Sequence, residues 1–249
     1  MGIALMITSG KGGVGKSTIA ANLAVALARL RYNVALVDAN TGMRGLDLLL
    51  GLQNDVVYDL NDLAEGLCRV RQALLPVPGV PGLTLLSASQ MARPDELSAD
   101  ALRGVLDRIK YNHRYVIVDG PPGIDTGFFT TLAACEKVII VTRPETAAER
   151  CAERMAQVLS EEGRRDGMLI VNEALPETPD EEGDWPHQAL ARRLGVKPIG
   201  LVPYSDDLAT MTRTGRAPAA PDGSMTRLFE DIARRAIGED LRLRPYAAR

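Results

Sequence analysis

The sequence predicts an α/β fold, in which helices cover both faces of a mostly parallel sheet. Two observations support this prediction. Short apolar segments without polar alternation recur along the chain, which is typical of strands buried on both faces. Segments of helical character separate them, and a helical crossover is the usual link between parallel strands. The length fits a single domain over residues 1–249, with residues 238–249 as a tail.

The first predicted elements are a strand, a glycine-rich loop and a helix. Ile3–Ile7 is an apolar strand that leads directly into the glycine-rich residues 10–15. Ser17–Arg31 is expected to be helical because it is rich in alanine and leucine, which are strong helix formers. Val34–Val37 is the next apolar strand, and it ends at Asp38. This order is the beginning of a parallel sheet.

The middle of the chain predicts two further strands with a helix between them. Leu83–Leu86 is a short apolar strand. A helix is expected from Ser98, whose hydroxyl can cap it, to about Lys110. Tyr115–Val118 is an apolar strand that ends at a carboxylate, Asp119.

The last third of the chain continues the alternation. Its apolar strands are Val138–Val141, Leu169–Val171 and Ile199–Val202. Helices are expected over Glu145–Glu161 and from about Met225 to Ile237. The acidic, proline-rich segment Pro176–Pro186 and the segment Ala217–Gly223 are expected to be surface loops.

Composition excludes several classes of protein. The net charge of −3 argues against a protein whose whole surface binds a polyanion. Cys68, Cys135 and Cys151 form no C-x-x-C pair, so they predict reduced thiols in the cytoplasm rather than a zinc site. Cys135 lies in an apolar stretch and is expected to be a small buried side chain. We recognise neither a signal peptide nor an apolar run of about 18 residues, so the sequence predicts a cytoplasmic protein.

The clearest motif is a phosphate-binding loop at residues 10–17, which match G-x-x-x-x-G-K-S. Glycines let backbone N–H groups point at phosphate oxygens, and the following helix adds the positive end of its dipole. Lys16 reaches the β- and γ-phosphates, and the hydroxyl of Ser17 is a ligand for Mg²⁺. The motif therefore predicts ATP and Mg²⁺ as cofactors. The expected binding residues here are Gly10, Lys11, Gly12, Gly13, Val14, Gly15, Lys16, Ser17 and Thr18.

Two aspartates at predicted strand ends are candidates for the metal site. Asp119 would help to organise the Mg²⁺ shell, and Gly123 after it would bring a backbone N–H to the γ-phosphate. Asp38 precedes a loop, residues 39–42, that would lie beside the phosphates and position water. The alternative remains that both aspartates cap ordinary turns. The predicted metal ligands are Ser17, Asp38 and Asp119.

These residues resemble those of the MinD/ParA family of P-loop ATPases, and most closely those of its MinD branch. The mark of the family is a second lysine in the loop, which is Lys11 here. The further matches, in chain order, are residues 42–48, 56–60, 66, 72–74, 86–90 and 118–124. The match covers roughly residues 3–235 and is weaker after about residue 145.

The resemblance implies an ATP-driven switch that positions the cell-division septum. ATP would join two chains face to face, and Lys11 of each would reach the phosphates bound by the other. Asn172 would read the adenine, and Pro203 would line the base. The implied partners are MinC-like and MinE-like proteins and an anionic membrane surface, so the protein would bind peripherally to the inner face of the cell membrane.

The main departure from the family is Asn40, where the family usually has an aspartate that activates the attacking water. Asparagine is neutral and a very poor base, so we predict ATP binding with slow or trapped hydrolysis. The predicted catalytic residues are therefore Lys11, Lys16, Asp38 and Asn40.

The C-terminal region also departs from the MinD branch, which usually ends in a basic amphipathic helix. Here Pro245 interrupts the short tail. The helix before it has an apolar stripe, which more often packs into a core than onto a membrane. The stripe is Leu228, Phe229, Ile232 and Ile237. Glu149, Arg150 and Arg154 differ from the branch as well and are expected to form a solvated helix face.

Three alternative functions stay open. A ParA-like partition ATPase would use nonspecific DNA as its matrix, with phosphate contacts from C-terminal arginines. Those arginines are Arg227, Arg234, Arg235, Arg242 and Arg244. An iron–sulfur carrier would need suitably placed cysteines, and the spacing here does not suggest them. A scaffold that binds ATP without turnover would explain Asn40.

Overall fold

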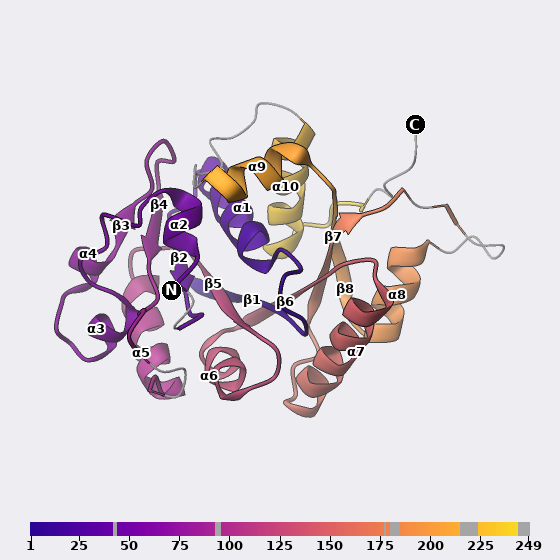
Figure 1. Cartoon of the computed structure of the whole chain (residues 1–249). Helices are drawn as coiled ribbons and strands as arrows, with labels where there is room; N and C mark the ends of the chain where they lie inside the picture. Colours follow the sequence, from indigo (N-terminus) through magenta and orange to yellow (C-terminus); the bar gives the residue numbers. More distant parts are fainter. Residues whose placement is uncertain (42–43, 93–95, 177, 180–184, 215–223, 244–249) are drawn as a thin grey trace.

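The computed structural model describes residues 1–41, 44–92, 96–176, 178–179, 185–214 and 224–243. In this part of the chain, the strands form one sheet in the order β3-β4-β2-β5-β1-β6-β7-β8 (Figure 1). Every neighbouring pair is parallel except β3 and β4. The strands are β1 (Ile3–Ser9), β2 (Val34–Asp38), β3 (Leu75–Pro76), β4 (Leu83–Leu86), β5 (Tyr115–Pro122), β6 (Lys137–Thr142), β7 (Met168–Ala174) and β8 (Lys197–Pro203). The predicted α/β class and parallel sheet are confirmed.

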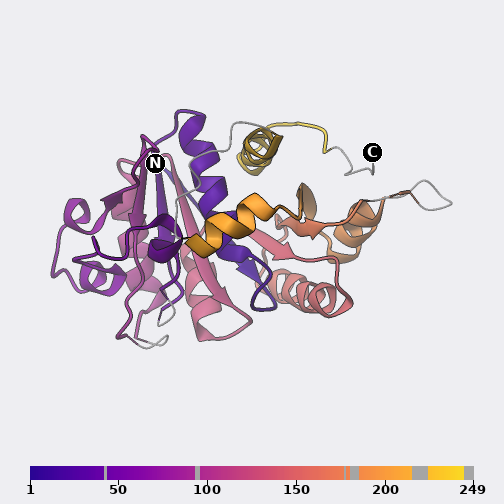
Figure 2. The same ribbon diagram turned by 45° about the horizontal axis from the view of Figure 1, so that its top comes forward.

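Helices lie on both faces of this sheet. α1 and α10 cover one face, while α5, α6, α7 and α8 cover the other, as Figures 1 and 2 show. The helices are α1 (Lys16–Arg29), α2 (Leu46–Leu50), α3 (Leu60–Ala64), α4 (Val70–Ala73), α5 (Ala99–Lys110), α6 (Thr126–Ala134), α7 (Thr146–Glu161), α8 (Pro186–Leu194), α9 (Asp206–Thr214) and α10 (Ser224–Ala236).

The central strand β1 explains why the apolar runs show no polar alternation. Leu5 and Ile7 belong to the core under α1, while Ala4 and Met6 belong to the core on the opposite face. All four side chains are fully buried. Successive residues of a strand point to opposite faces, so a strand covered on both sides must be apolar at every position.

The sheet order places the functional loops at one edge. From β1 the chain crosses to β2 on one side of the sheet, whereas β6, β7 and β8 extend the other side. At such a switch point the loops after neighbouring strands diverge and leave a crevice outside the carboxyl ends. The predicted phosphate and metal residues lie at this edge, in the loop after β1, in the first turn of α1 and toward the carboxyl ends of β2 and β5.

Several predicted boundaries were wrong by a few residues. α1 ends at Arg29 rather than Arg31, because Arg31 has φ 67°, outside the helical region. β5 continues to Pro122, so Asp119 lies within the strand rather than at its end. Pro186 is not the end of a loop; it begins α8, where a proline at the first helical position lacks only an N–H that would have no partner. The predicted loop 217–223 lies outside the described residues.

The short elements of the first third were not predicted. α2, α3 and α4 have only four or five residues each, which is too short for a helical period to show in the sequence. The longer helix α6 was also missed. It consists mostly of apolar residues and threonines around Gly127, so its sequence lacks the polar face that marks an amphipathic helix. Ser98 does cap α5, since its hydroxyl accepts a hydrogen bond from the N–H of Ala101 at 3.2 Å.

The apolar stripe of α10 packs into the core, as predicted. Phe229 and Ile232 are buried, and Leu228 and Ile237 pack partly buried against the same cluster. Arg235 is buried too, and its guanidinium donates to the carbonyls of Ile199, Leu241 and Arg242 at 3.0–3.1 Å. It therefore holds the tail against β8, and its predicted use as a DNA phosphate contact is wrong.

Two further predictions concern the cysteines and the membrane. Cys135 is buried, as predicted, and burial raises the pKa of its thiol to about 12. Cys68 is also buried, whereas Cys151 is half-buried beside the phosphate loop. Among the described residues, no helix is both long enough and apolar enough to cross a bilayer.

Candidate nucleotide site

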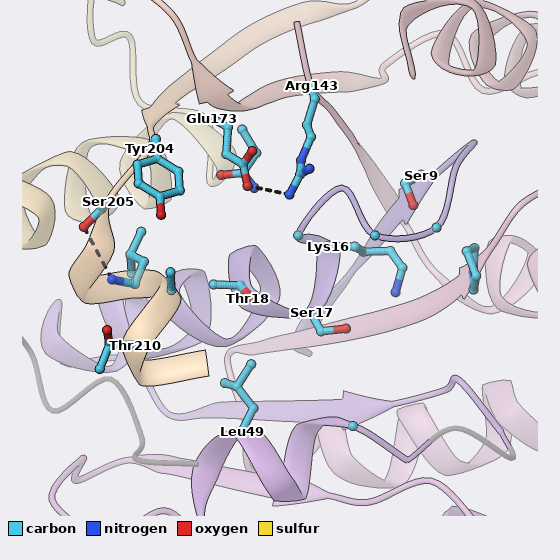
Figure 3. Close-up of a pocket in the computed structure, with 18 of the residues that line it drawn as sticks. Ser9, Lys16, Ser17, Thr18, Leu49, Arg143, Glu173, Tyr204, Ser205 and Thr210 are labelled. Atoms are coloured by element: carbon cyan, nitrogen blue, oxygen red, sulfur yellow. Dashed lines mark hydrogen bonds and ion pairs between the residues drawn. The ribbon is translucent and has the colours of Figure 1, made fainter. Parts of the chain in front are cut away.

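A cavity of about 790 Å³ opens at the carboxyl ends of the central strands. Nine of the predicted site residues line it: Gly12, Gly13, Gly15, Lys16, Ser17, Thr18, Asn40, Asn172 and Pro203. Residues that were not predicted line it as well: Ser9, Gly45, Leu48, Leu49, Pro122, Arg143, Glu173, Tyr204, Ser205, Asp206, Leu208, Ala209 and Thr210. Figure 3 shows the phosphate-loop side chains on one side of the cavity and the β8–α9 residues on another.

The phosphate loop needs glycine at particular positions. Gly13 and Gly15 have φ values of 79° and 88°, a region that L-residues rarely adopt. A Cβ on Gly15 would also lie 2.2 Å from the side-chain nitrogen of Asn172. Asn172 comes from β7 and donates from Nδ2 to the carbonyl of Val14 at 2.9 Å. Asn172 therefore braces the phosphate loop from the wall of the cavity where the adenine was predicted.

Lys16 and Asp119 form a buried ion pair. Nζ of Lys16 lies 2.7 Å from Oδ1 of Asp119, and the two side chains are 7% and 2% exposed. The first residue of α1 and the strand β5 thus bring the predicted phosphate-binding cation and the predicted metal-binding carboxylate into direct contact.

Asp38 lies at the end of β2, in register with Asp119 on the neighbouring strand β5. Its carboxylate accepts backbone hydrogen bonds from Asn40, Gly45 and Leu46 at 3.0–3.1 Å. Burial, together with the charge of Asp119, raises the pKa of Asp38 to about 6 despite these hydrogen bonds, which lower it. Asp38 therefore shapes the loop that contains Asn40.

Asn40 faces the cavity at the position where the sequence predicted a water-positioning group. Its backbone N–H is fixed by Asp38, and its carbonyl accepts from the N–H of Arg44 at 3.4 Å. The residue is half-buried and lines the cavity together with Lys16 and Ser17.

Not every predicted residue reaches the cavity. Gly10, Lys11, Val14, Asp38, Asp119 and Gly123 are absent from its lining. Lys11 is 43% exposed, and its Nζ lies 3.1 Å from Oε2 of Glu145. The N–H of Gly123 donates to the carbonyl of Ser9 at 2.9 Å. This N–H could therefore reach the γ-phosphate, as predicted, only if its hydrogen bond to Ser9 were broken.

Arg143 and Glu173 are an ion pair among the lining residues that the sequence analysis missed. Arg143 directly follows β6, and its guanidinium is ion-paired with Glu173 (Figure 3). Arg143 could have been found by the rule that pointed to Asp38, since both residues stand at the carboxyl end of a parallel strand. Glu173 gave no such signal, because it lies inside β7.

The donor atoms at this edge suit Mg²⁺. The ion prefers hard oxygen ligands, and it usually takes one or two carboxylates together with phosphate oxygens and water. Ser17 offers a hydroxyl in the cavity wall, and Asp38 and Asp119 offer buried carboxylates on adjacent strands. These residues fit a metal that arrives with a nucleotide.

Comparison with known proteins agrees with this geometry. Residues 2–237 match the family model described as "ParA: NUBPL iron-transfer P-loop NTPase". The septum site-determining protein MinD of Synechocystis is 37% identical over 240 residues, which are 95% of this chain and 90% of that protein.

Solved structures give the same result. MinD in the MinC:MinD complex of Aquifex aeolicus superposes with a TM-score of 0.82 at 32% identity, covering 98% of this chain and 100% of that one. The septum site-determining protein MinD of Pyrococcus horikoshii, solved with Mg-ADP, gives a TM-score of 0.79 at 25% identity and covers 94% and 96%. Together with the phosphate loop and its buried carboxylates, these similarities show that the chain belongs to the MinD/ParA family of P-loop NTPases.

Proposed function

We propose that this chain is an ATP-dependent dimerisation switch that helps to position the cell-division septum. The observation that supports it most directly is the buried Lys16–Asp119 pair at the phosphate loop, which joins the phosphate-binding and metal-binding groups of a P-loop ATPase. The relatives named as septum site-determining proteins support the biological role.

The residues have distinct tasks in binding ATP. The backbone N–H groups of the glycine-rich loop and Lys16 bind the phosphates, while Asn172, Pro203 and Tyr204 enclose the base. Ser17, Asp38 and Asp119 would hold Mg²⁺. The metal, when bound, neutralises charge that develops on the phosphate oxygens.

Lys11 acts between two chains. Its ammonium group lies outside the cavity of its own chain, on an exposed part of the loop. A partner chain placed face to face with this edge would receive Lys11 near its bound phosphates. Leu48 and Tyr204, which are 55% and 62% exposed beside the cavity, are then covered by the partner.

Hydrolysis is slow in this chain because Asn40 cannot accept a proton from the attacking water. The ATP-bound dimer is therefore long-lived. MinC-like and MinE-like proteins bind that dimer, and an anionic membrane surface holds it peripherally; ATP hydrolysis releases both. The MinC:MinD complex of Aquifex aeolicus supports a MinC-like partner.

Size-exclusion chromatography with light scattering tests the switch. The chain is expected to elute as a monomer with Mg-ADP and as a dimer with Mg-ATP. Lys11→Ala should bind Mg-ATP in calorimetry but remain monomeric. A chain that binds no Mg-nucleotide, or whose mass does not change with ATP, would contradict the proposal. Sedimentation with anionic vesicles and Mg-ATP tests the membrane claim in the same way, since absence of ATP-dependent pelleting refutes it.

A further inference from the structure

The strand β7 has a bulge at the cavity. The register between β7 and β8 shifts between Asn172 and Ala174, and Glu173 between them has φ 53°, a conformation that non-glycine residues seldom adopt. In a regular strand, Asn172 and Glu173 would point to opposite faces. Here both line the cavity, because the bulge turns Glu173 toward it.

Arg143 reaches the same wall from the neighbouring strand β6. Its guanidinium is ion-paired with Glu173, and its Nη1 lies 3.9 Å from Oε1 of Glu145. The Nε atom of Arg143 is buried and has no hydrogen-bond partner among the described residues. Figure 3 shows the guanidinium extending along the wall toward the phosphate loop. Because Nε is buried, a ligand in the cavity would be bound by the partly exposed end of the guanidinium, where, in the described part of the chain, Nη1 makes only the long contact with Glu145.

Few charged side chains line the described part of the cavity, so the guanidinium of Arg143 matters for the binding of a charged ligand. Among the described residues that line it, Lys16 and Arg143 are the cations, and Glu173 and Asp206 are the acids. Lys16 is already paired with Asp119. Arg143 is 27% exposed and Glu173 is 35% exposed, so both groups are partly desolvated and act strongly on a charged ligand.

We infer that Arg143 is an additional positioning residue for the phosphate chain of ATP, and that Glu173 competes with the phosphates for its guanidinium. Both claims rest on the proposed function, since they assign the same cavity to a nucleotide. A phosphate oxygen would satisfy the free donors of Arg143 with charge-assisted hydrogen bonds. The carboxylate of Glu173 offers the same charge-assisted hydrogen bonds to the guanidinium, so it competes with the phosphates for Arg143 and lowers the affinity for nucleotide.

Calorimetric titration with Mg-ATP separates this competition from a merely structural ion pair. Arg143→Gln should weaken Mg-ATP binding by about tenfold or more, which is about 1.4 kcal/mol, whereas Arg143→Lys should keep most of the affinity. Glu173→Gln should tighten binding by about threefold or more. The double variant should bind like Arg143→Gln, because Glu173 acts through the arginine. If the ion pair only stabilised the β7 bulge, both Arg143→Gln and Glu173→Gln would bind Mg-ATP more weakly than the parent chain.

Arg193 supplies the matched control. It is an ion-paired arginine between α8 and α7, with Glu149 at 2.8 Å, and it lies outside the cavity. Arg193→Gln should leave the affinity for Mg-ATP unchanged, and thermal melting without nucleotide verifies that each variant is folded. Absence of Mg-ATP binding by the parent chain would refute the proposed function itself. Equal affinities of the parent and Arg143→Gln, or weaker binding by Glu173→Gln, would refute this inference alone.

Discussion

Nζ of Lys16 lies 2.7 Å from Oδ1 of Asp119, and both side chains are almost completely buried. The contact joins the helix after the phosphate loop to the strand next to β1, so one interaction connects the two halves of the site. Neither charge can lose its partner without a penalty, because an unpaired charge in the interior is poorly solvated. This pair is therefore expected to contribute both to stability and to the proposed binding of nucleotide.

Lys16→Met should abolish Mg-ATP binding and also destabilise the fold. Breaking a buried pair from one side typically costs about 3–5 kcal/mol, because the remaining carboxylate stays buried without its cation. Lys110→Met is the matched control, since Lys110 is a buried lysine that pairs with Glu136 at 2.6 Å, far from the cavity. It should lower stability in urea denaturation yet leave calorimetric ATP binding intact. Retention of full ATP affinity by Lys16→Met would exclude the assigned role.

The raised pKa of Asp38 predicts that the free energy of unfolding depends on pH. Its pKa is about 6 in the folded chain, against an ordinary value of 3.8. Between these values the folded state holds a proton that the unfolded state has released, so stability falls as the pH rises from about 4 to about 6. The loss from this group is at most about 3 kcal/mol, at about 1.4 kcal/mol per pKa unit. Asp38→Asn removes the titrating carboxyl, so the difference in unfolding free energy between variant and parent, measured in urea, should change between about pH 4 and about pH 6. A difference that stays constant over this pH range would contradict the raised pKa of Asp38.

The sequence predicts the phosphate loop well, but it does not predict the part of the cavity wall formed by Arg143 and Glu173. The loop is a contiguous motif whose chemistry fixes its residues, and six of the nine residues predicted at 10–18 line the cavity. The Arg143–Glu173 wall depends on a bulge in β7, and period-two reasoning places Glu173 on the wrong face. The aspartates were found because they follow apolar strands, yet the Lys16–Asp119 contact itself depends on the order in which the strands assemble.

Gly15→Ala should damage the loop for two separate reasons. Its φ of 88° strains any side chain, and the new Cβ would lie 2.2 Å from Nδ2 of Asn172. We expect a loss of about 1–3 kcal/mol in stability together with loss of Mg-ATP binding. Gly12→Ala is the stability control, because a Cβ added at Gly12 would meet nothing within 4 Å. The double variant Gly15→Ala/Asn172→Ala should recover only part of the stability in thermal melting, since the strain at φ persists; full recovery would attribute the whole effect to the clash.

Asn40→Asp should accelerate hydrolysis of bound ATP. The backbone N–H of Asn40 is held by Asp38 at 3.0 Å, so an aspartate introduced at residue 40 would keep its place at the cavity wall and add a base. General-base catalysis contributes about 10²–10⁴-fold, and we expect an increase of at least about tenfold in single-turnover rate. Asn40→Ala keeps the backbone contact but offers no base, so it should not accelerate the reaction. If the parent chain and Asn40→Asp hydrolyse bound ATP at equal rates, the neutral side chain of Asn40 is not what limits turnover.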